Sequence, residues 1–268
     1  MLRANIQKSG LLKEMIKPLL QLPWVQEGVA WVKFSAKALW ELPRAFRYWR
    51  ETLRQMYIMG NQALPLVILA SVFVSMVLAL EWSKKLEPFG AKLMVGRIVG
   101  ISVIREIGPM VTGLMVAGRT GAKIVSEIGN MVLGEQIDAL RAFGTDPIGR
   151  LIVPRVFASV VVMGPLIIIS DALAIIAGWF ATVTWMGVDS DFFWLSFKAG
   201  ILPKDIYVGL IKPPFFGLLI ALISAYFGYT IKGGAEGMGR AATRTVMYSS
   251  LGVLIMDFIL TKIVLAFS

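Results

Sequence analysis

The sequence predicts an all-α integral membrane protein with five spans, and three observations point to this fold class. Of its 268 residues, 57% are hydrophobic and only 16% are charged, whereas a soluble domain carries about 25% charged residues. The mean hydropathy is +0.72, and the apolar residues cluster in five long runs. The net charge of +10 is unevenly distributed along the chain. We therefore expect the apolar excess to face lipid.

The sequence contains neither cysteine nor histidine. This excludes disulfides, the usual zinc sites, thiol nucleophiles and every catalytic triad that uses an imidazole. We expect no catalytic residue, no metal site and no cofactor bound by this chain.

A membrane-spanning helix needs about 20 mostly apolar residues. The apolar runs predict a transmembrane domain over residues 63–268, and its five spans are listed here. They cover about 63–82, 97–118, 156–187, 206–230 and 246–267. The third run is long enough to tilt strongly or to bend at Gly164-Pro165.

Two segments precede the first span. Residues 1–23 form an N-terminal extension without the apolar core of a secretory signal, and residues 24–62 predict an interfacial helix region. Past Pro43, apolar side chains recur at helical spacing opposite four arginines, which is typical of a helix in the headgroup layer. The two sets are Phe46, Trp49, Leu53 and Met56 or Tyr57 against Arg44, Arg47, Arg50 and Arg54. The alternative is a cap helix packed on the bundle.

The distribution of basic residues predicts the orientation. Outside the spans, 18 lysines and arginines lie on the side of the N-terminus and 6 on the opposite side. The N-terminus is therefore expected in the cytoplasm, and the C-terminus outside. The basic excess indicates membrane topology, and we expect no nucleic-acid partner.

Two glycine-rich segments resemble nucleotide-binding loops only superficially. Residues 113–120 (G-L-M-V-A-G-R-T) have Arg119 where a phosphate-binding loop needs lysine, and no strand precedes them. Gly113, Ala117 and Gly121 are instead spaced by four, which allows close helix packing in a membrane. The glycines of residues 233–239 predict a flexible cytoplasmic loop. ATP hydrolysis would have to come from another chain.

Charged residues interrupt the apolar runs at Arg105-Glu106, Asp171, Lys212 and Asp257. Each costs roughly 2.5–3.5 kcal/mol at the middle of a bilayer, so we expect pairs, Arg105 with Glu106 and Lys212 with Asp257. These charges either fix the helix register or form a polar patch on a substrate path. For Asp171 we favour the structural role.

Residues 119–155 are too polar to cross a membrane, and a short amphipathic helix is predicted over 135–143. Ile137, Leu140 and Phe143 would share one face of it. Gly144 would end it, and Asp146-Pro147 would cap and begin the next helix. The short helix either transmits force from a cytoplasmic partner or is an ordinary connector on the membrane surface.

Two ordered blocks of motifs resemble the MlaE-type (YrbE-type) permease family, the membrane subunits of ABC transporters that act on lipids with mammalian-cell-entry (MCE) proteins. The first block contains R-E-I-G-P (105–109), A-G-R-T-G-A (117–122), S-E-I-G (126–129), E-Q-I-D-A-L (135–140), G-T-D-P (144–147) and V-P-R (153–155). The second runs from Thr243 to Thr261. The resemblance begins at about residue 24.

The resemblance implies a bacterial inner-membrane complex. A second permease copy would form a homodimer, two ATPases that bind ATP and magnesium would dock in the cytoplasm, and an MCE hexamer would sit on the periplasmic face. Related paired permeases are the alternative to a homodimer. Phospholipid would occupy a cavity between the two permeases.

The resemblance also implies roles for particular residues. Those of the coupling helix that contacts the ATPase are Glu135, Gln136, Ile137, Asp138, Leu140 and Phe143. Those expected to line the lipid cavity are Val77, Leu78, Leu86, Phe89, Arg105 and Glu106. Lys212 and Asp257 match further charged positions of the family's membrane region, which extends the intramembrane charge network beyond Arg105 and Glu106.

The leading hypothesis is therefore an ABC lipid permease without chemistry of its own, which exchanges phospholipid with the MCE channel and maintains outer-membrane lipid asymmetry. An importer of sterols, fatty acids or other hydrophobic molecules is the alternative within the family. From other classes, an ion-coupled secondary carrier or a scaffold for the MCE ring stays open.

Overall fold

The structure, a computed structural model, describes residues 23–267, so most of the predicted N-terminal extension lies outside the described residues. Within this range every regular element is helical. Five helical segments are long and apolar enough to cross a membrane, which confirms the predicted fold class. They are Trp49–Phe89, Lys92–Leu133, Ile148–Met186, Pro203–Tyr229 and Gly234–Ala266.

The chain forms ten α-helices in its described part. They are α2 (Pro23–Trp40), α3 (Trp49–Leu86), α4 (Val95–Ser102), α5 (Gly108–Val116), α6 (Ala122–Leu133), α7 (Gln136–Ala142), α8 (Val153–Met186), α9 (Ser190–Gly200), α10 (Pro203–Tyr229) and α11 (Gly234–Phe267). The short turns between them are 3-10 helical at Leu42–Phe46, Glu87–Phe89 and Lys92–Met94, and π-helical at Val103–Ile107, Ala117–Gly121 and Ile148–Ile152.

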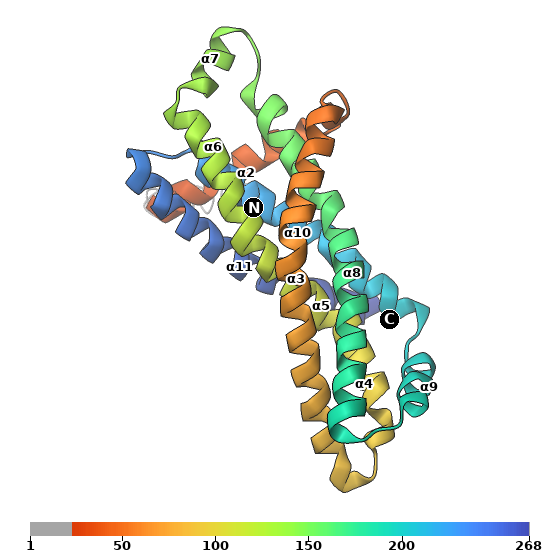
Figure 1. Cartoon of the computed structure of the whole chain (residues 1–268). Coiled ribbons are helices and arrows are strands. Elements are labelled where there is room, and N and C mark those ends of the chain that lie inside the picture. Colours follow the sequence, from red (N-terminus) through yellow and green to blue (C-terminus); the bar gives the residue numbers. More distant parts are fainter. Residues whose placement is uncertain (1–22, 268) are drawn as a thin grey trace, which may run out of the picture.

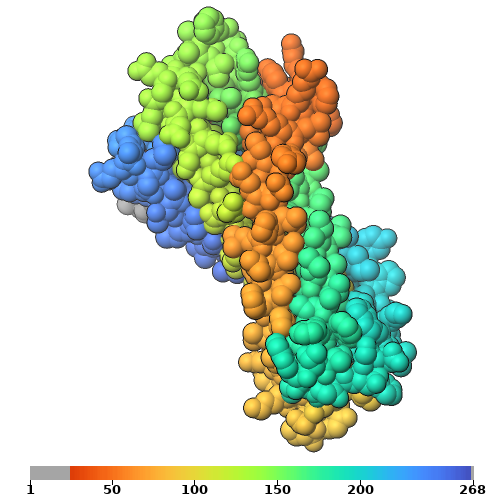
Figure 2. All heavy atoms as spheres, in the orientation of Figure 1, coloured from red at the N-terminus to blue at the C-terminus, as the bar shows by residue number. Residues whose placement is uncertain are grey.

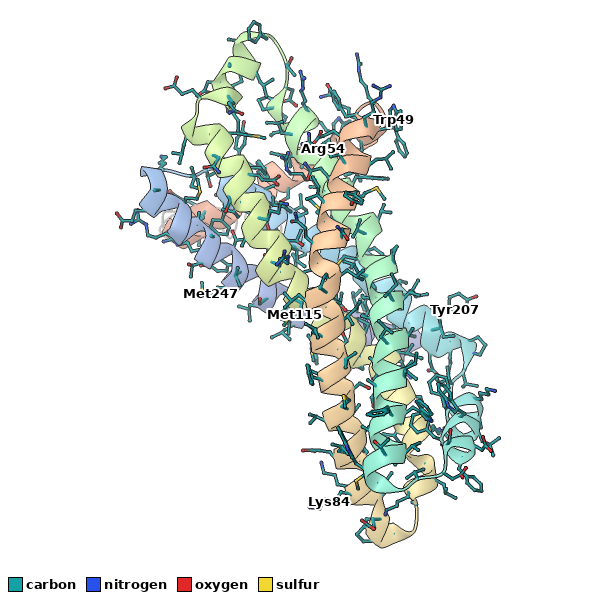
Figure 3. All side chains as sticks on the ribbon, viewed as in Figure 1. Trp49, Arg54, Lys84, Met115, Tyr207 and Met247 are labelled. Atoms are coloured by element: carbon teal, nitrogen blue, oxygen red, sulfur yellow. The ribbon has the colours of Figure 1, made fainter. Side chains whose placement is uncertain are left out.

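Helices α3 and α8 run side by side along the molecule, with α7 at one end and α9 at the other (Figure 1). We call these the α7 end and the α9 end. The molecule is broad at the α7 end, where α6, α7 and α11 gather, and narrower at the α9 end (Figure 2). Met247 of α11 and Tyr207 of α10 project from opposite sides of the bundle (Figure 3).

The first span differs from the predicted arrangement at its start. Helix α3 continues for 38 residues without a break through Pro65, so residues 49–62 are continuous with the first span and do not form a separate helix. Trp49 and Arg54 lie at one end of this helix and Lys84 at the other (Figure 3). The separate helix before the span is α2, and the chain turns at Leu42–Phe46, where Pro43 begins a new helical turn.

The second span is a chain of α4, α5 and α6 joined by two π-helical turns. It extends from Lys92 to Leu133, well beyond the predicted 97–118. Single π-helical turns are rare in proteins as a whole, and those that occur often lie at functional sites. The first of these turns contains Arg105 and Glu106, and the second contains Arg119.

The α9 end carries a helix that the apolar runs did not reveal. Asp189 begins α9 by accepting hydrogen bonds from the backbone N–H groups of Asp191 (2.9 Å) and Phe192 (3.3 Å). Phe193 is fully buried. Gly96 of α4 lies so close to α9 that a Cβ there would be 2.2 Å from the Phe193 carbonyl oxygen. Helix α9 therefore packs directly on the second span.

The predicted glycine loop between the last two spans is much shorter than expected. Gly233 and Gly234 have positive φ angles of 90° and 63° and make the turn. Gly237 and Gly239 already belong to α11. Gly237 is needed for packing, because a Cβ there would lie 1.9 Å from the Lys232 carbonyl oxygen. Helix α11 then leaves one long apolar face exposed, whereas α10 is covered on most sides.

Candidate functional site in the charged groups of the spans and the α7 end

Lys212 of α10 lies at the middle of an intramembrane charge centre, which we define as Arg105, Glu106, Asp205, Lys212 and Asp257. The Lys212 side chain is fully buried. Its Nζ lies 2.6 Å from Glu106 Oε2 and 2.9 Å from Asp257 Oδ1. One ammonium group therefore holds together the second, fourth and fifth spans.

The third contact of Lys212 follows from the sequence of the second span. Pro109 has no backbone N–H, so the carbonyl four residues earlier, that of Arg105, receives no helical hydrogen bond from it. Lys212 Nζ donates a hydrogen bond to this carbonyl oxygen at 2.9 Å. Pro109 thus frees the acceptor that fixes the lysine, next to the π-helical turn of residues 103–107.

Arg105 pairs with Asp205 and not with Glu106 as predicted. Arg105 Nη1 lies 3.2 Å from Asp205 Oδ1, and the Asp205 side chain is 4% exposed. Neighbouring side chains on one helix point apart by about 100°, which explains why Arg105 and Glu106 find different partners. Asp205 also accepts the Leu202 N–H at 2.9 Å in the first turn of α10. Asp205 lies just before the predicted fourth span, and nothing near it in the sequence identifies it as the partner of Arg105.

The charge centre contains two cations and three carboxylates, so one negative charge is not balanced within it when all groups are ionised. Glu106 is the member that reaches the surface, with its side chain 39% exposed against 14% for Asp257. Thr261 of α11 donates a hydrogen bond to Glu106 Oε2 at 3.2 Å. The arrangement presents one carboxylate at the surface of the subunit.

Of the other residues expected to line a lipid cavity, Val77 and Phe89 are exposed. Leu78 and Leu86 are half-buried against the apolar cluster around Ala79 and Val99. Five pockets of up to about 420 Å³ among residues 23–267 have linings that include none of these side chains. A shared cavity would need a second subunit.

The small residues spaced by four lie where helices approach closely. A Cβ at Gly113 would lie 2.8 Å from Val253 Cγ1, and one at Gly121 would lie 3.2 Å from Ser224 Oγ. Ala117 is fully buried in the same cluster as Val253. These three positions let α10 and α11 pack against the second span.

Asp171 of α8 is buried, and its carboxylate takes the space beside Gly108. A Cβ at Gly108 would lie 1.9 Å from Asp171 Oδ1. Asp171 therefore contacts the second span two residues after Glu106 but stands outside the charge centre.

Helix α7 is the short helix predicted over 135–143, and Phe143 does not share the buried face of Ile137 and the half-buried Leu140. Glu135 begins it with a φ of 57°, and Gly144 follows its end with a φ of 69°. Ile137 is 4% exposed and packs into the core of the subunit, whereas Phe143 is 85% exposed. So short a helix needs an anchor in its own subunit, and Ile137 supplies it. The outward residues are Glu135, Gln136, Asp138, Ala139, Arg141, Ala142 and Phe143.

Arg141 connects α7 to the end of the fourth span. Its Nη2 donates to the hydroxyl of Tyr229 at 2.6 Å, and its Nη1 donates to Asp138 at 2.7 Å. The guanidinium also lies 5.7 Å from the centre of the Tyr229 ring. Tyr229 is the last residue of α10, the helix that carries Lys212.

A second cluster of charges at this end, the α2-loop cluster, joins α2 to the segment after α7. It consists of Lys37, Glu41, Arg44 and Asp146. Lys37 Nζ donates to Asp146 Oδ1 at 3.1 Å, and Arg44 lies 3.2 Å from Glu41 and 3.6 Å from Asp146. Asp146 accepts the Gly149 N–H at 3.3 Å, as an N-cap does.

The pKa values of the two carboxyl groups of the α2-loop cluster are shifted in opposite directions. Burial and the neighbouring Asp146 raise the pKa of Glu41 above its ordinary value, although Arg44 and Lys37 oppose the shift. Burial also acts upward on the pKa of Asp146, but hydrogen bonds from Glu41, Lys37 and the Gly149 N–H outweigh it and lower that pKa. Glu41 is therefore the group of the pair that takes up a proton first.

Comparison with known proteins places this architecture in a family. The model of the family described as "Permease MlaE" matches residues 52–263. The intermembrane phospholipid transport system permease protein MlaE of Haemophilus influenzae is 38% identical over 82% of this chain and 85% of that protein. A probable ABC transporter permease protein of Rickettsia felis is 37% identical over 86% of this chain and 89% of its own length.

A plant relative is more distant. The chloroplastic protein TRIGALACTOSYLDIACYLGLYCEROL 1 of Arabidopsis thaliana is 33% identical over 80% of this chain and 61% of that protein. The matched residues 52–263 include the charge centre, α7 and all but the outermost three residues of the first and last spans. The chain belongs to the MlaE permease family.

Proposed function

We propose that this chain is the membrane-spanning permease of an ABC transporter that moves phospholipid between the bacterial inner membrane and an MCE channel, and so serves outer-membrane lipid asymmetry. The observation that carries the proposal is the 38% identity, over 82% of the chain, to a permease named for intermembrane phospholipid transport. The chain itself would hydrolyse nothing, and a partner ATPase would bind ATP and magnesium.

The α7 end would face the cytoplasm in this assembly. The positive-inside rule favours this orientation, since 18 basic residues outside the predicted spans lie on the side of the N-terminus and 6 on the other. The α9 end would then face the periplasmic MCE hexamer. Helix α7 would offer its outward face to an ATPase, with Phe143 as the apolar anchor and Glu135, Asp138 and Arg141 around it.

Movement of α7 would reach the charge centre through α10. Arg141 holds the hydroxyl of Tyr229, and Lys212 lies 17 residues earlier on the same helix, about 25 Å away at 1.5 Å per residue. A second link joins α6 to α8, where Arg155 lies 3.1 Å from Glu127. A displacement of α7 would therefore be transmitted to the second, third and fourth spans together.

Lipid would bind between two copies of the chain, beside the exposed carboxylate of Glu106. Each methylene that an acyl chain buries contributes about 0.8 kcal/mol, so release and not binding is the difficult step. Closure driven by ATP binding would reduce the apolar space and expel the lipid towards the MCE channel.

The decisive experiment is reconstitution with its ATPase and MCE partners in liposomes, with labelled phospholipid, fatty acid and sterol offered separately. ATP-dependent transfer of phospholipid alone is expected. Transfer of only the sterol or the fatty acid would replace phospholipid as the substrate. ATP-independent transfer that stops when the proton gradient is collapsed would instead support the ion-coupled carrier, which the unbalanced carboxylate of the charge centre makes worth testing.

Docking on α7 is tested by Phe143→Arg. We expect this variant to lose co-purification with the ATPase while it remains folded, because the side chain is 85% exposed. Leu195→Arg is the matched control, since Leu195 is 63% exposed at the α9 end. Equal ATPase binding by both variants would refute α7 as the docking site.

A further inference from the structure

An apolar groove lies between α2, α10 and α11 towards the α7 end, away from the charge centre. Its volume is about 420 Å³, within the usual range for ligand pockets of about 300–1,000 Å³. Its lining includes four aromatic residues, Trp31, Tyr226, Phe227 and Tyr248. The rings of Phe227 and Tyr248 stack with centroids 5.6 Å apart and an interplanar angle of 10°. We call this the aromatic groove.

The aromatic groove continues into a polar pocket that shares Glu27 and Phe227 with it. This second pocket measures about 200 Å³ and contains three cations, Lys232, Arg240 and Arg244. Glu27 is the acidic side chain in its lining, and Arg244 Nη1 lies 3.9 Å from it. Arg240 forms an ion pair with Glu236, one turn earlier on α11. The three cations and these two carboxylates leave one net positive charge. The Arg244 side chain is 58% exposed, so its guanidinium can turn to another anion.

The two pockets together match the polarity of a phospholipid, since an apolar groove adjoins a cationic pocket. Along α11 the aromatic groove extends from Tyr248 to Ile255, about 10 Å at 1.5 Å per residue. This is less than the half-thickness of the hydrocarbon core, about 15 Å. The cations precede Tyr248 along the chain, with Lys232 in the turn after α10 and both arginines in the first part of α11. Phosphate would thus meet arginine and lysine while the chains lie against the aromatic rings.

We propose that this composite site holds one anionic phospholipid of the leaflet at the α7 end, with its phosphate at Lys232, Arg240 and Arg244 and its acyl chains in the aromatic groove. The site is separate from the proposed transport path. Ile255 and Asp257 lie two residues apart on α11, which places them about 200° apart around the helix. The inference goes beyond the proposed function, because a lipid held here need not be transported.

Charge argues for a lipid as the occupant and against a second copy of the chain. A two-fold symmetric contact brings the same surface patch of both copies together. A contact centred on the polar pocket would then bring its net positive charge against itself, because Lys232, Arg240 and Arg244 outnumber Glu27 and Glu236. An anionic headgroup instead compensates them, and leaflet lipid is present at the required depth.

Native mass spectrometry of the full complex, in nanodiscs containing phosphatidylglycerol or phosphatidylcholine, tests the proposal. We expect one retained phosphatidylglycerol per permease at this site and little phosphatidylcholine. Gly28→Leu should abolish the retention, since Gly28 lines the groove and its position has open space for a side chain. Gly164→Leu is the matched control, because that position is also open but lies on α8.

The headgroup contact is tested separately. Arg244→Gln should weaken phosphatidylglycerol retention about five-fold, the effect of one cation near an anionic lipid. Arg47→Gln, which removes an exposed arginine elsewhere at the α7 end, should leave it unchanged. Equal retention of the two lipids, or no effect of Gly28→Leu and Arg244→Gln, would overturn the proposal. So would a disulfide between two copies through Gly28→Cys, which is informative because the chain has no native cysteine.

Discussion

The charge centre and the α2-loop cluster use the same ion-pair chemistry in opposite surroundings. The Lys212 side chain is fully buried and contacts the carboxylates of Glu106 and Asp257. The Lys37 side chain, by contrast, is 51% exposed, and the Asp146 side chain that it contacts is 31% exposed. An exposed pair contributes about 0–1 kcal/mol, whereas breaking a buried pair by removing one partner costs about 3–5 kcal/mol. The first cluster therefore fixes the packing of the spans, and the second can exchange partners with water or with another protein.

This contrast suits a permease that is driven from one end. Glu106, Lys212 and Asp257 keep three spans in one arrangement, and the exposed links at the α7 end can rearrange at small cost. The four predictions below test the difference, in order of decreasing effect.

Removing the central ammonium should have the largest effect. Lys212→Ala leaves Glu106 and Asp257 without their shared cation, and we expect a loss of about 3–5 kcal/mol in the free energy of unfolding. Denaturant unfolding of the purified protein in detergent measures it. The triple variant Lys212→Met, Glu106→Gln and Asp257→Asn should recover most of the loss, because it leaves no buried charge among these three positions. A Lys212→Ala protein as stable as wild type would show that the charge centre does not fix the spans.

A methyl group at the contact between α10 and the first π-helical turn should have the next largest effect. A Cβ at Gly209 would lie 2.1 Å from the Ile104 carbonyl oxygen, so Gly209→Ala should destabilise by about 1–3 kcal/mol. Gly118→Ala is the control, because the space around it is open, and it should be neutral or stabilising by up to about 1 kcal/mol. Thermal unfolding measures the melting temperatures of both variants. Equal melting temperatures would contradict the close packing of Gly209 against Ile104.

The Arg141–Tyr229 link should matter more for transport than for stability. Arg141→Gln removes the guanidinium from the Tyr229 hydroxyl, and we expect stability to change by less than about 1 kcal/mol. Lipid transfer per ATP hydrolysed should nevertheless fall several-fold, because α7 would no longer pull on α10. Arg150→Gln, at another exposed arginine of the same end, should transfer lipid normally. Unchanged transfer by Arg141→Gln would remove this link from the mechanism.

The smallest effect concerns pH. Since the pKa of Glu41 is raised in the folded protein, its contribution to stability is present at low pH and is lost as pH rises through that pKa. Asp146, whose pKa is lowered, contributes in the opposite sense and loses its contribution only as pH falls through its own pKa. We expect Glu41→Gln to flatten the decline in melting temperature as pH rises above the ordinary pKa of a glutamate, about 4.3. The same decline in wild type and variant would show that Glu41 does not cause it.

The hydropathy and charge of the sequence were sufficient for the spans but not for the partners inside them. Length and apolarity locate a span because the bilayer sets both. Asp205 was missed because a carboxylate in the first turn of a helix reads as a cap, and nothing local indicates that Arg105 reaches it across 100 positions of the chain. Lys212 with Asp257 was foreseen because each interrupts an apolar run and needs an opposite charge.

The faces of short helices were harder to predict than the spans. Ile137 and Phe143 read as one apolar face, yet one points into the subunit and the other into solvent. A helix of seven residues has too few positions for periodicity to distinguish an anchor from a docking residue. Helix α9 was missed for a similar reason. Its eleven residues are short of a span, and polar residues are interspersed among its aromatic ones, as they are in many loops.

The unbroken length of α3 has a consequence for where the energy of ATP can act. Thirty-eight residues extend about 57 Å, and a bilayer with its headgroups is about 40–45 Å thick. The first span must therefore rise more than 10 Å out of the membrane or tilt strongly to fit. Where the helix rises at the α7 end, the proposed ATPase would bind helices that extend beyond the headgroups. A conformational change of the ATPase would then tilt the spans through these protruding ends, while the ATPase itself stays outside the lipid.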